Sequence, residues 1–300
     1  MANIVEQIAS ITGEQSWKGN VLQTLKQGKQ FLKRDYKMQV QLKSTVVDYC
    51  ISHALSDKHN SLLQFGCMNH KHDQVCSECI NIEKIIDEIE SKINAINYQN
   101  SVEKESASYD LANARDSISE WKKHLLRAVH QDKVKFDILK KLQSNEALLH
   151  LDWAMKWIGT ASREDQSSWF GKRGVPRHIA VAISLAQKDE YESHTYVHVF
   201  DQTPQDAATV IAIIGDILQR LARRQINKVY LRSDNAGCYH GSQTIAAMAH
   251  MSRKYGVEVS RWDFSEPQAG KGPCGRVAAN IKRRIKMYSI LMKVTHAPTL

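Results

Sequence analysis

The hydrophobic periodicity of this chain changes near residue 146, and this change constrains its fold more than any other sequence feature. Between residues 18 and 142, apolar residues recur at the spacing of amphipathic helices. Downstream, runs such as ALLHLDW, HIAVAISL and TYVHVF have the length and residue types of strands. We therefore predict a helical region over residues 1–145 and an α/β domain over residues 146–300.

Two apolar stripes predict amphipathic helices in the first region, each with one face toward a core. The first stripe comprises Ile82, Ile85, Ile86, Ile89, Ile93 and Ile96. The second comprises Ile118, Trp121, Leu125, Val129, Phe136 and Leu139. Between them, residues 97–108 (NYQNSVEKESAS) are polar and aperiodic, so we expect a loop or hinge there.

The second region has the order β, β, β, α, β, α, β, α. Strands are predicted over Ala147–Trp153, His178–Leu185, Thr195–Phe200, Lys228–Leu231 and Val257–Phe264. One helix is predicted after Thr203-Pro204 with Pro204 near its first turn, a second over Gln243–Tyr255 up to Gly256, and a basic one from near Pro273. A hairpin followed by α/β alternation predicts a mixed five-stranded sheet with flanking helices.

The segment CMNHKHDQVCSEC is the densest group of metal-binding residue types in the chain. Five candidate ligands fall within 13 positions, namely Cys67, His70, His72, Cys76 and Cys79. Because Zn²⁺ prefers four N and S ligands, we expect a closed, structural zinc site with one His to spare. Cys50-x2-His53 is a weaker pair that could replace members of this set. The alternative is ordinary core cysteines with surface histidines.

Two aspartates occupy the strand positions that metal-dependent phosphodiester chemistry requires. Asp152 lies within the first predicted strand in apolar surroundings, and Asp234 follows the fourth strand in LRSDNAGCYH. Carboxylates from neighbouring strands can hold Mg²⁺ or Mn²⁺ beside a scissile phosphate. Taken separately, Asp234 could be a turn residue, and Asp152 could be a buried carboxylate that pairs with Arg or a Trp N–H. Together they favour a magnesium site.

At these residues the chain resembles a known family. The stretch from Asp152 to Tyr288 is similar to the ribonuclease H-like catalytic core of the retroviral integrase superfamily, and closely resembles cut-and-paste transposase-derived proteins of animal genomes. LDWAMKW, SSWFGKRG, SDNAGCYH and FSEPQAGKGPCGRVAANIKRRI carry the resemblance. It extends upstream through CISHALSD, the Cys/His-rich segment and WKKHLLRAVHQDK, so that it covers most of residues 48–290.

The resemblance implies DNA strand cleavage and transfer by three acids, and here the chain departs from the pattern. Relatives carry the third acid at the position of Gly275, which leaves Asp152 and Asp234 without it. Glu266, or less directly Asp263, is a candidate replacement. A non-catalytic descendant that binds DNA or a protein partner is therefore the main alternative. A structure-specific or exonucleolytic ribonuclease is a third option, supported only by the acids.

The charge of the chain favours an anionic partner. Its formal net charge is +9, and from Lys271 to the end there are seven Lys or Arg residues and no acid. We expect DNA contacts from Lys271, Arg276, Lys282, Arg283 and Arg284, the alternative being a solvated helix face. The first residues do not resemble a signal peptide, and no apolar run is long enough for a membrane span. We therefore expect a nuclear DNA-binding protein, without a membrane partner and with homo-oligomerisation open.

Overall fold

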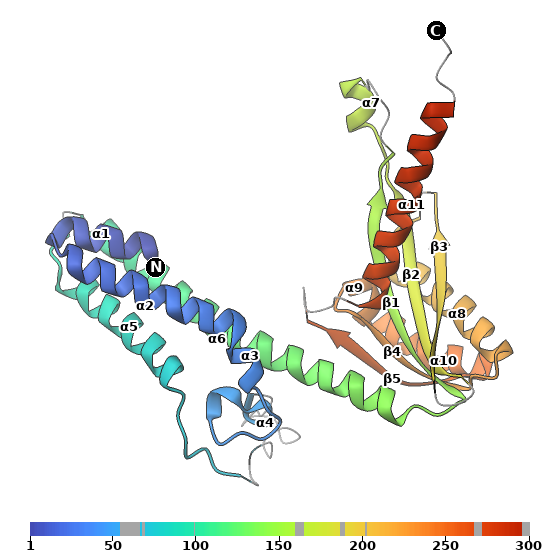
Figure 1. Cartoon of the computed structure of the whole chain (residues 1–300), viewed down its shortest axis with the longest axis horizontal. Helices are drawn as coiled ribbons and strands as arrows, with labels where there is room; N and C mark the ends of the chain where they lie inside the picture. The colour runs from blue at the N-terminus through green and yellow to red at the C-terminus, as the bar shows by residue number, and fades with distance from the viewer. Residues whose placement is uncertain are drawn as a thin grey trace. The chain divides into compact units, whose positions relative to one another are not determined.

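The computed structural model describes residues 1–54, 67, 70–98, 100–159, 165–186, 190–201, 203–266 and 272–295. The chain forms two compact units, Met1–Lys133 and Val134–Leu300. The division between the units falls inside helix α6 (Ser101–Lys141), upstream of the first strand. Figure 1 labels the elements of both units, and each unit is described by itself.

The first unit is helical, as the sequence predicted. Its elements are α1 (Ala2–Thr12), α2 (Gln15–Arg34), α3 (Tyr36–Gln39), the 3-10 turn η1 (Val47–Tyr49), α4 (Ile51–Ala54), α5 (Ser77–Ala95) and the first part of α6. The predicted isoleucine stripe is buried along α5 from Ile82 to Ile93, and Ile96 packs against the same core just beyond the helix end. This stripe lies in one hydrophobic core with residues from α1, α2 and α6.

The predicted loop over residues 97–108 is wrong for most of its length, because α6 begins at Ser101. The side chain of Asn100 accepts a hydrogen bond from the Val102 amide at 2.9 Å, which caps the helix start. Ala107 and Leu111 are buried in the core, so packing favours a helix where the sequence pattern is weak. The second stripe is only partly buried: Leu125 lies in the core, whereas Trp121 and Phe136 are exposed.

The second unit contains the predicted mixed five-stranded sheet with flanking helices. Its strands are β1 (Glu146–Trp157), β2 (Val175–Leu185), β3 (Tyr191–Val199), β4 (Lys228–Asp234) and β5 (Glu258–Ser265), in the order β3-β2-β1-β4-β5. β1, β2 and β3 pair antiparallel in succession, and β1, β4 and β5 pair parallel. The sheet therefore joins a meander to a parallel half at β1.

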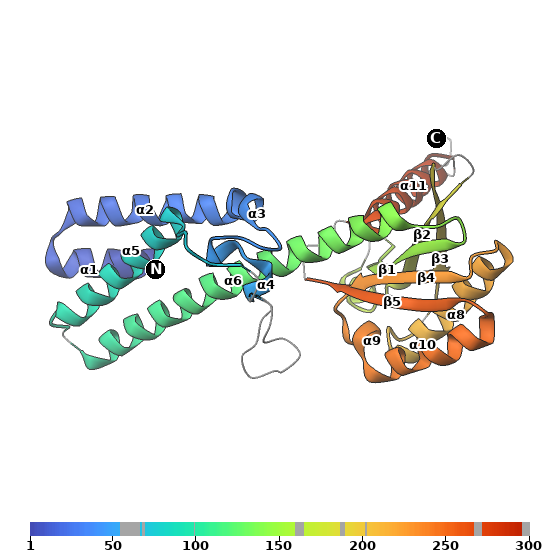
Figure 2. The same ribbon diagram turned by 90° about the horizontal axis from the view of Figure 1, so that it is seen from below.

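Helices cover both faces of this sheet (Figure 2). On one face lie α8 (Ala207–Arg223), α9 (Gly237–His240) and α10 (Ser242–Tyr255), which share a large apolar core with the strands. On the other face lies α11 (Pro273–Thr295), whose Val277, Ala278 and Ile281 pack against a smaller core. A short helix, α7 (Gln166–Phe170), stands in the connection between β1 and β2.

Two helix ends can be compared with the Gly and Pro signals that predicted them. α10 ends at Gly256, as predicted, and the φ of +66° at that glycine is a conformation that other residues rarely adopt. α8 begins at Ala207, so Thr203-Pro204 does not open the helix as predicted, although Pro204 lies only three residues before its start. Asp206 caps α8 instead, because its carboxylate accepts a hydrogen bond from the Thr209 amide at 2.9 Å. Among the described helices, none is long and apolar enough to cross a membrane.

Candidate functional site

Asp152 and Asp234 lie beside each other on the parallel strands β1 and β4. His150 of β1 pairs with Arg232 of β4, and each aspartate lies two residues further along its strand. Side chains two residues apart point to the same face of a sheet, and neighbouring strands are about 4.8 Å apart. The two carboxylates therefore share the α11 face of the sheet, and we call them the carboxylate pair.

The carboxylate pair carries unfavourable electrostatics in its ionised form. Asp152 is half-buried, and burial together with the negative charge of Asp234 raises its pKa from 3.8 to about 6. Asp234 is exposed at the end of β4, where one carboxylate oxygen accepts a hydrogen bond from the Ala236 amide at 3.1 Å. A proton or a bound cation at this point would relieve the repulsion between the two groups.

The start of α11 lies next to the carboxylate pair. The thiol of Cys274 donates a hydrogen bond to the carbonyl oxygen of His150 at 3.4 Å, which fixes the first turn of α11 against β1. Burial and the charge of Asp152 raise the pKa of this thiol, in agreement with that proximity. At Gly275, the next residue, an added Cβ would meet no described atom within 4 Å. A larger side chain therefore fits at Gly275.

The two acids that could replace the missing third ligand lie on or just after β5. Asp263 shares the face of the carboxylate pair by strand alternation, but its carboxylate forms an ion pair with Arg261 at 2.7 Å. Ser265 pairs with Asp234 in the sheet, and Glu266 follows it just past the strand. The alternation of β5 thus assigns the position beside Asp234 to Ser265 and not to Glu266.

Two further residues, His150 and Arg232, lie on the same face of the sheet as the carboxylate pair, and neither was predicted as a site residue from the sequence. His150 is buried one alternation before Asp152, and its pKa is lowered to about 4 by burial and then by the charges of Arg232, Lys135 and Arg276. This imidazole is neutral near pH 7. The two-residue period of β1 and β4 is the sequence signal that would have placed His150 and Arg232 beside the acids.

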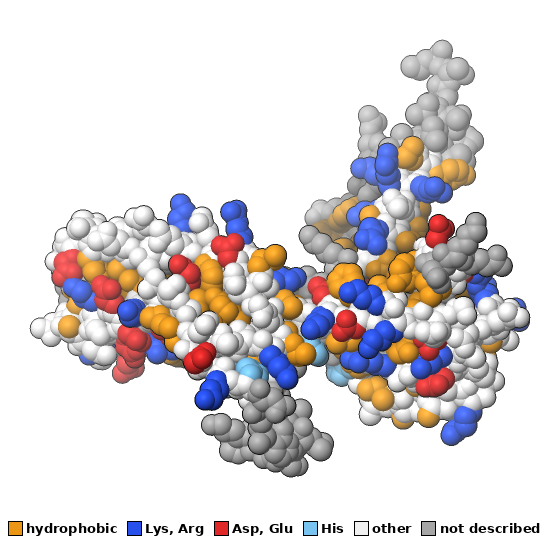
Figure 3. All heavy atoms as spheres, turned by 60° about the horizontal axis from the view of Figure 1, so that its bottom comes forward, with side chains coloured by type: hydrophobic (Ala, Val, Ile, Leu, Met, Phe, Trp, Pro, Cys, Tyr) orange, Lys and Arg blue, Asp and Glu red, His pale blue; other side chains and the backbone are white. Residues whose placement is uncertain are grey.

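The predicted DNA-binding residues on α11 lie on its exposed side. Arg276, Lys282, Arg283 and Arg284 are all exposed, and α11 contains no Asp or Glu. Figure 3 shows Lys and Arg side chains along this helix at the upper right. Lys271 lies outside the described residues. The opposite side of α11 packs on the sheet, so the basic side faces solvent.

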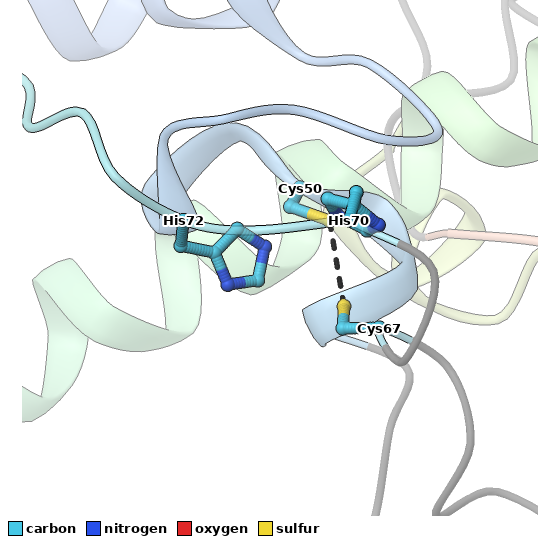
Figure 4. Close-up of side chains that lie close together, drawn as sticks. All are labelled: Cys50, Cys67, His70 and His72. Carbon is cyan, nitrogen blue, oxygen red and sulfur yellow. Dashed lines mark hydrogen bonds between the residues drawn. The ribbon is translucent and has the colours of Figure 1, made fainter.

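The first unit contains a second group of functional residue types, the Cys/His cluster of Cys50, Cys67, His70 and His72 (Figure 4). One ligand atom from each residue lies within 4.8 Å of the others. The sulfur of Cys50 is 3.7 Å from that of Cys67 and 3.2 Å from Nε2 of His70. Nδ1 of His70 and Nε2 of His72 are buried without a hydrogen-bond partner among the described residues. This group can hold a metal ion.

The Cys/His cluster contains three of the five predicted ligands and replaces the other two by Cys50. Cys76 instead caps α5, and its sulfur accepts hydrogen bonds from the Cys79 amide at 3.2 Å and the Tyr49 hydroxyl at 2.6 Å. Cys79 is buried in the helical core. Cys50 joins the cluster because isolated bridges pair Gln41 with Cys50 and Val46 with Gln74, contacts that residue spacing does not reveal.

Comparison with known proteins gives one family. No curated protein matches the chain. The family described as "Domain of unknown function (DUF8701)" matches residues 131–298, which include all five strands and the carboxylate pair but not the Cys/His cluster. Because this match spans more than half of the chain, the protein belongs to the DUF8701 family.

Proposed function

We propose that this protein is a DNA-binding, transposase-derived protein whose second unit is a ribonuclease H-like core with an incomplete catalytic site. The observation that carries the proposal is the position of the carboxylate pair on adjacent parallel strands, with the start of α11 beside it. Three structural elements thus meet at the point where DNA cleavage by this class of enzyme would take place.

The topology of the sheet supports the ribonuclease H-like assignment. The succession of a meander, a helix, a parallel strand, further helices, a second parallel strand and a final helix agrees with the order predicted from the residue pattern. The sequence motifs of that resemblance occupy matching positions. LDWAMKW lies in β1, SDNAGCYH joins β4 to α9, and GPCGRV begins α11.

The donor set of the carboxylate pair fits a hard divalent cation. Carboxylate oxygens are the ligands that Mg²⁺ and Mn²⁺ prefer, and the pKa of Asp152 indicates negative charge that needs compensation. A bound ion would activate the attacking hydroxyl and stabilise the leaving oxygen. Because Gly275 supplies no third carboxylate, we expect this chain to bind the ion weakly and to cleave DNA weakly or not at all.

DNA is the partner that the exposed charges favour, and the nucleus is therefore the expected compartment. The described exposed side chains of α11 include five basic residues and no acid, namely Arg276, Lys282, Arg283, Arg284 and Lys286. Such a helix contacts phosphates of any sequence, which gives affinity without base recognition. α11 begins beside the carboxylate pair, so that a phosphate backbone along it would pass close to Asp152 and Asp234.

Zinc is the metal that best fits the Cys/His cluster. In a tetrahedral site with Zn–S bonds of about 2.3 Å, two sulfurs lie roughly 3.8 Å apart, close to the 3.7 Å between Cys50 and Cys67. That distance is much longer than a disulfide bond of about 2.05 Å. Four protein ligands leave no open position, so the role of this zinc is structural.

The test of the proposal is DNA nicking by the natural chain and by Gly275→Asp, both supplied with Mn²⁺ or Mg²⁺. The open space at Gly275 allows an aspartate, and a carboxylate in the first turn of a helix is electrostatically favourable. We expect Gly275→Asp to raise nicking by orders of magnitude and Gly275→Asp with Asp234→Asn to abolish it. Strong nicking by the natural chain that is lost in Glu266→Gln would assign the third acid to Glu266 instead.

Gly275 also favours a second candidate, a regulator that binds DNA or a protein partner without cleaving. If Gly275→Asp remains inactive while the natural chain binds DNA, the binding role is the function that survives. If the natural chain binds no DNA, the charged face of α11 serves another purpose and the proposal fails.

A further inference from the structure

The connection between β1 and β2 exposes large apolar side chains to solvent. We call residues 155–159 and 165–174 the α7 arm. Within it, Met155 is 87% exposed, Phe170 76%, Trp169 48% and Ile158 45%. Scattered exposed apolar residues are normal, but four on one short arm indicate a contact surface.

The α7 arm is also basic. It carries Lys156, Lys172 and Arg173, and Asp165 is the one acid among its described residues. The ammonium of Lys172 lies 5.6 Å from the centre of the Trp169 ring and donates a hydrogen bond to the Gly159 carbonyl at 2.5 Å. These three basic residues line a pocket of about 530 Å³ at the base of the arm, together with Asp201 and Pro204 among others.

The base of the arm is held in a fixed position relative to the carboxylate pair. Lys156 lies four residues after Asp152 on β1, which at about 3.3 Å per residue is roughly 13 Å. Gly174 packs against Lys156 so closely that an added Cβ would lie 2.7 Å from the Lys156 Cβ. The two stems of the arm can therefore approach each other only with glycine at this position. In Figure 1, α7 and the outer part of α11 extend beyond the same end of the sheet.

We infer that the α7 arm binds unpaired bases of DNA, with Trp169 and Phe170 as stacking surfaces and with Lys156, Lys172 and Arg173 as phosphate contacts. This inference rests on the proposed function, because it assumes a DNA strand at the carboxylate pair. Exposed aromatic rings interleaved with basic groups are the features of proteins that bind single strands, where each base offers a ring to stack on. The arm thus adds recognition of unpaired bases to the phosphate contacts of α11.

The experiment compares the affinity of the full, zinc-loaded chain for single-stranded and blunt double-stranded DNA by fluorescence anisotropy, with Mg²⁺ and Mn²⁺ left out of the buffer to prevent cleavage. Oligonucleotides of about 20 nucleotides exceed the ~4–16 nucleotide sites of single-strand binders. The variants are Trp169→Ala with Phe170→Ala, the conservative pair Trp169→Phe with Phe170→Tyr, and the control pair Trp121→Ala with Phe136→Ala. The control removes the same two residue types from exposed positions elsewhere.

We expect the alanine pair at the arm to weaken single-strand binding at least about tenfold, since each stacked base contributes roughly that factor. Duplex binding should change less than about threefold and keep its salt dependence, because the phosphate contacts remain. The conservative pair should retain affinity, and the control pair should behave like the natural chain.

Unchanged single-strand binding by the alanine pair, or equal losses for both DNA forms, would overturn the inference. A membrane surface would be the partner of the arm instead if vesicles of anionic phospholipid bind the natural chain but not the alanine pair, and if both proteins bind DNA equally well. The proposed function is judged separately. If Gly275→Asp nicks DNA but the alanine pair binds single strands as the natural chain does, only the inference about the α7 arm fails. If that pair loses single-strand binding but Gly275→Asp does not nick DNA, only the proposed cleavage site fails.

Discussion

Replacement of Asp152 by asparagine is expected to stabilise the second unit at neutral pH. The natural side chain is ionised at pH 7 in a half-buried position beside Asp234. Asparagine has the same shape without the charge, so it removes both the cost of burial and the repulsion. If the substitution raises the free energy of unfolding, the fold does not require an aspartate at position 152.

The magnitude follows from the pKa. The pKa of Asp152 is about 6 in the folded chain, against 3.8 for an ordinary aspartate. At about 1.4 kcal/mol for each tenfold change, the full difference corresponds to roughly 3 kcal/mol. Solvent screening of a partly exposed group reduces this, and we expect Asp152→Asn to raise the free energy of unfolding by about 1–2 kcal/mol at pH 7.5.

The sign of the pH dependence distinguishes this cause from others. Because the folded pKa is raised, the folded chain binds the Asp152 proton more tightly than the unfolded chain. The contribution of Asp152 to stability is therefore lost as the pH rises from about 4 through 6, and the loss is complete above that range. The advantage of Asp152→Asn should be largest at pH 7.5 and close to zero at pH 4.

Urea unfolding followed by hydrogen exchange of β1 peptides measures this unit separately from the helical one. Asp234→Asn is the matched control, since it removes only the second cause, the repulsion, and should stabilise less. No gain at pH 7.5, or the same gain at pH 7.5 and pH 4, would refute the placement of Asp152 in a half-buried site next to another carboxylate.

Two further predictions concern the metal cluster and the basic helix. Purified protein should contain about one equivalent of zinc by metal analysis; Cys50→Ser should release it, whereas Cys79→Ser should keep it and only weaken the helical core, and retention of zinc by Cys50→Ser would contradict the ligand set. Neutralising Lys282, Arg283 and Arg284 should weaken DNA binding for all sequences and reduce the slope of log affinity against log salt by about 2–3, at roughly 0.9 for each phosphate contact. Neutralising the exposed Lys26, Lys29 and Lys33 of α2 is the control, and an equal effect there would reduce the role of α11 to net charge.

The sequence predicted the strands well because their residue pattern and their environment agree. All five predicted strands are present, yet β1 extends four residues beyond the predicted Trp153. Its pairing with β2 continues to Trp157 opposite Val175, past an irregularity in register. Such an extension depends on a partner strand, and the local sequence of β1 contains no information on it. The same kind of error occurred at residues 97–108, where a loop was predicted but burial of Ala107 and Leu111 favours a helix.

The same distinction applies to the candidate sites. The carboxylate pair was predictable because strand order and a two-residue period suffice to bring Asp152 and Asp234 together. Cys50 was predicted only as an alternative ligand, because its selection over Cys76 and Cys79 depends on bridges between separate segments that residue spacing does not reveal. The contact surface of the α7 arm could not be predicted, because the sequence SSWFGKRG does not reveal that Trp169 and Phe170 face solvent.

The most direct test of the account is Mn²⁺ binding by the purified, zinc-loaded chain, measured by electron paramagnetic resonance of the free ion. The account predicts one weak, saturable site that is lost in Asp152→Asn and in Asp234→Asn, kept in Cys50→Ser and tightened in Gly275→Asp. Mn²⁺ affinity that is the same in the natural chain and in both asparagine variants would contradict it, because the two carboxylates would then not form a shared metal site.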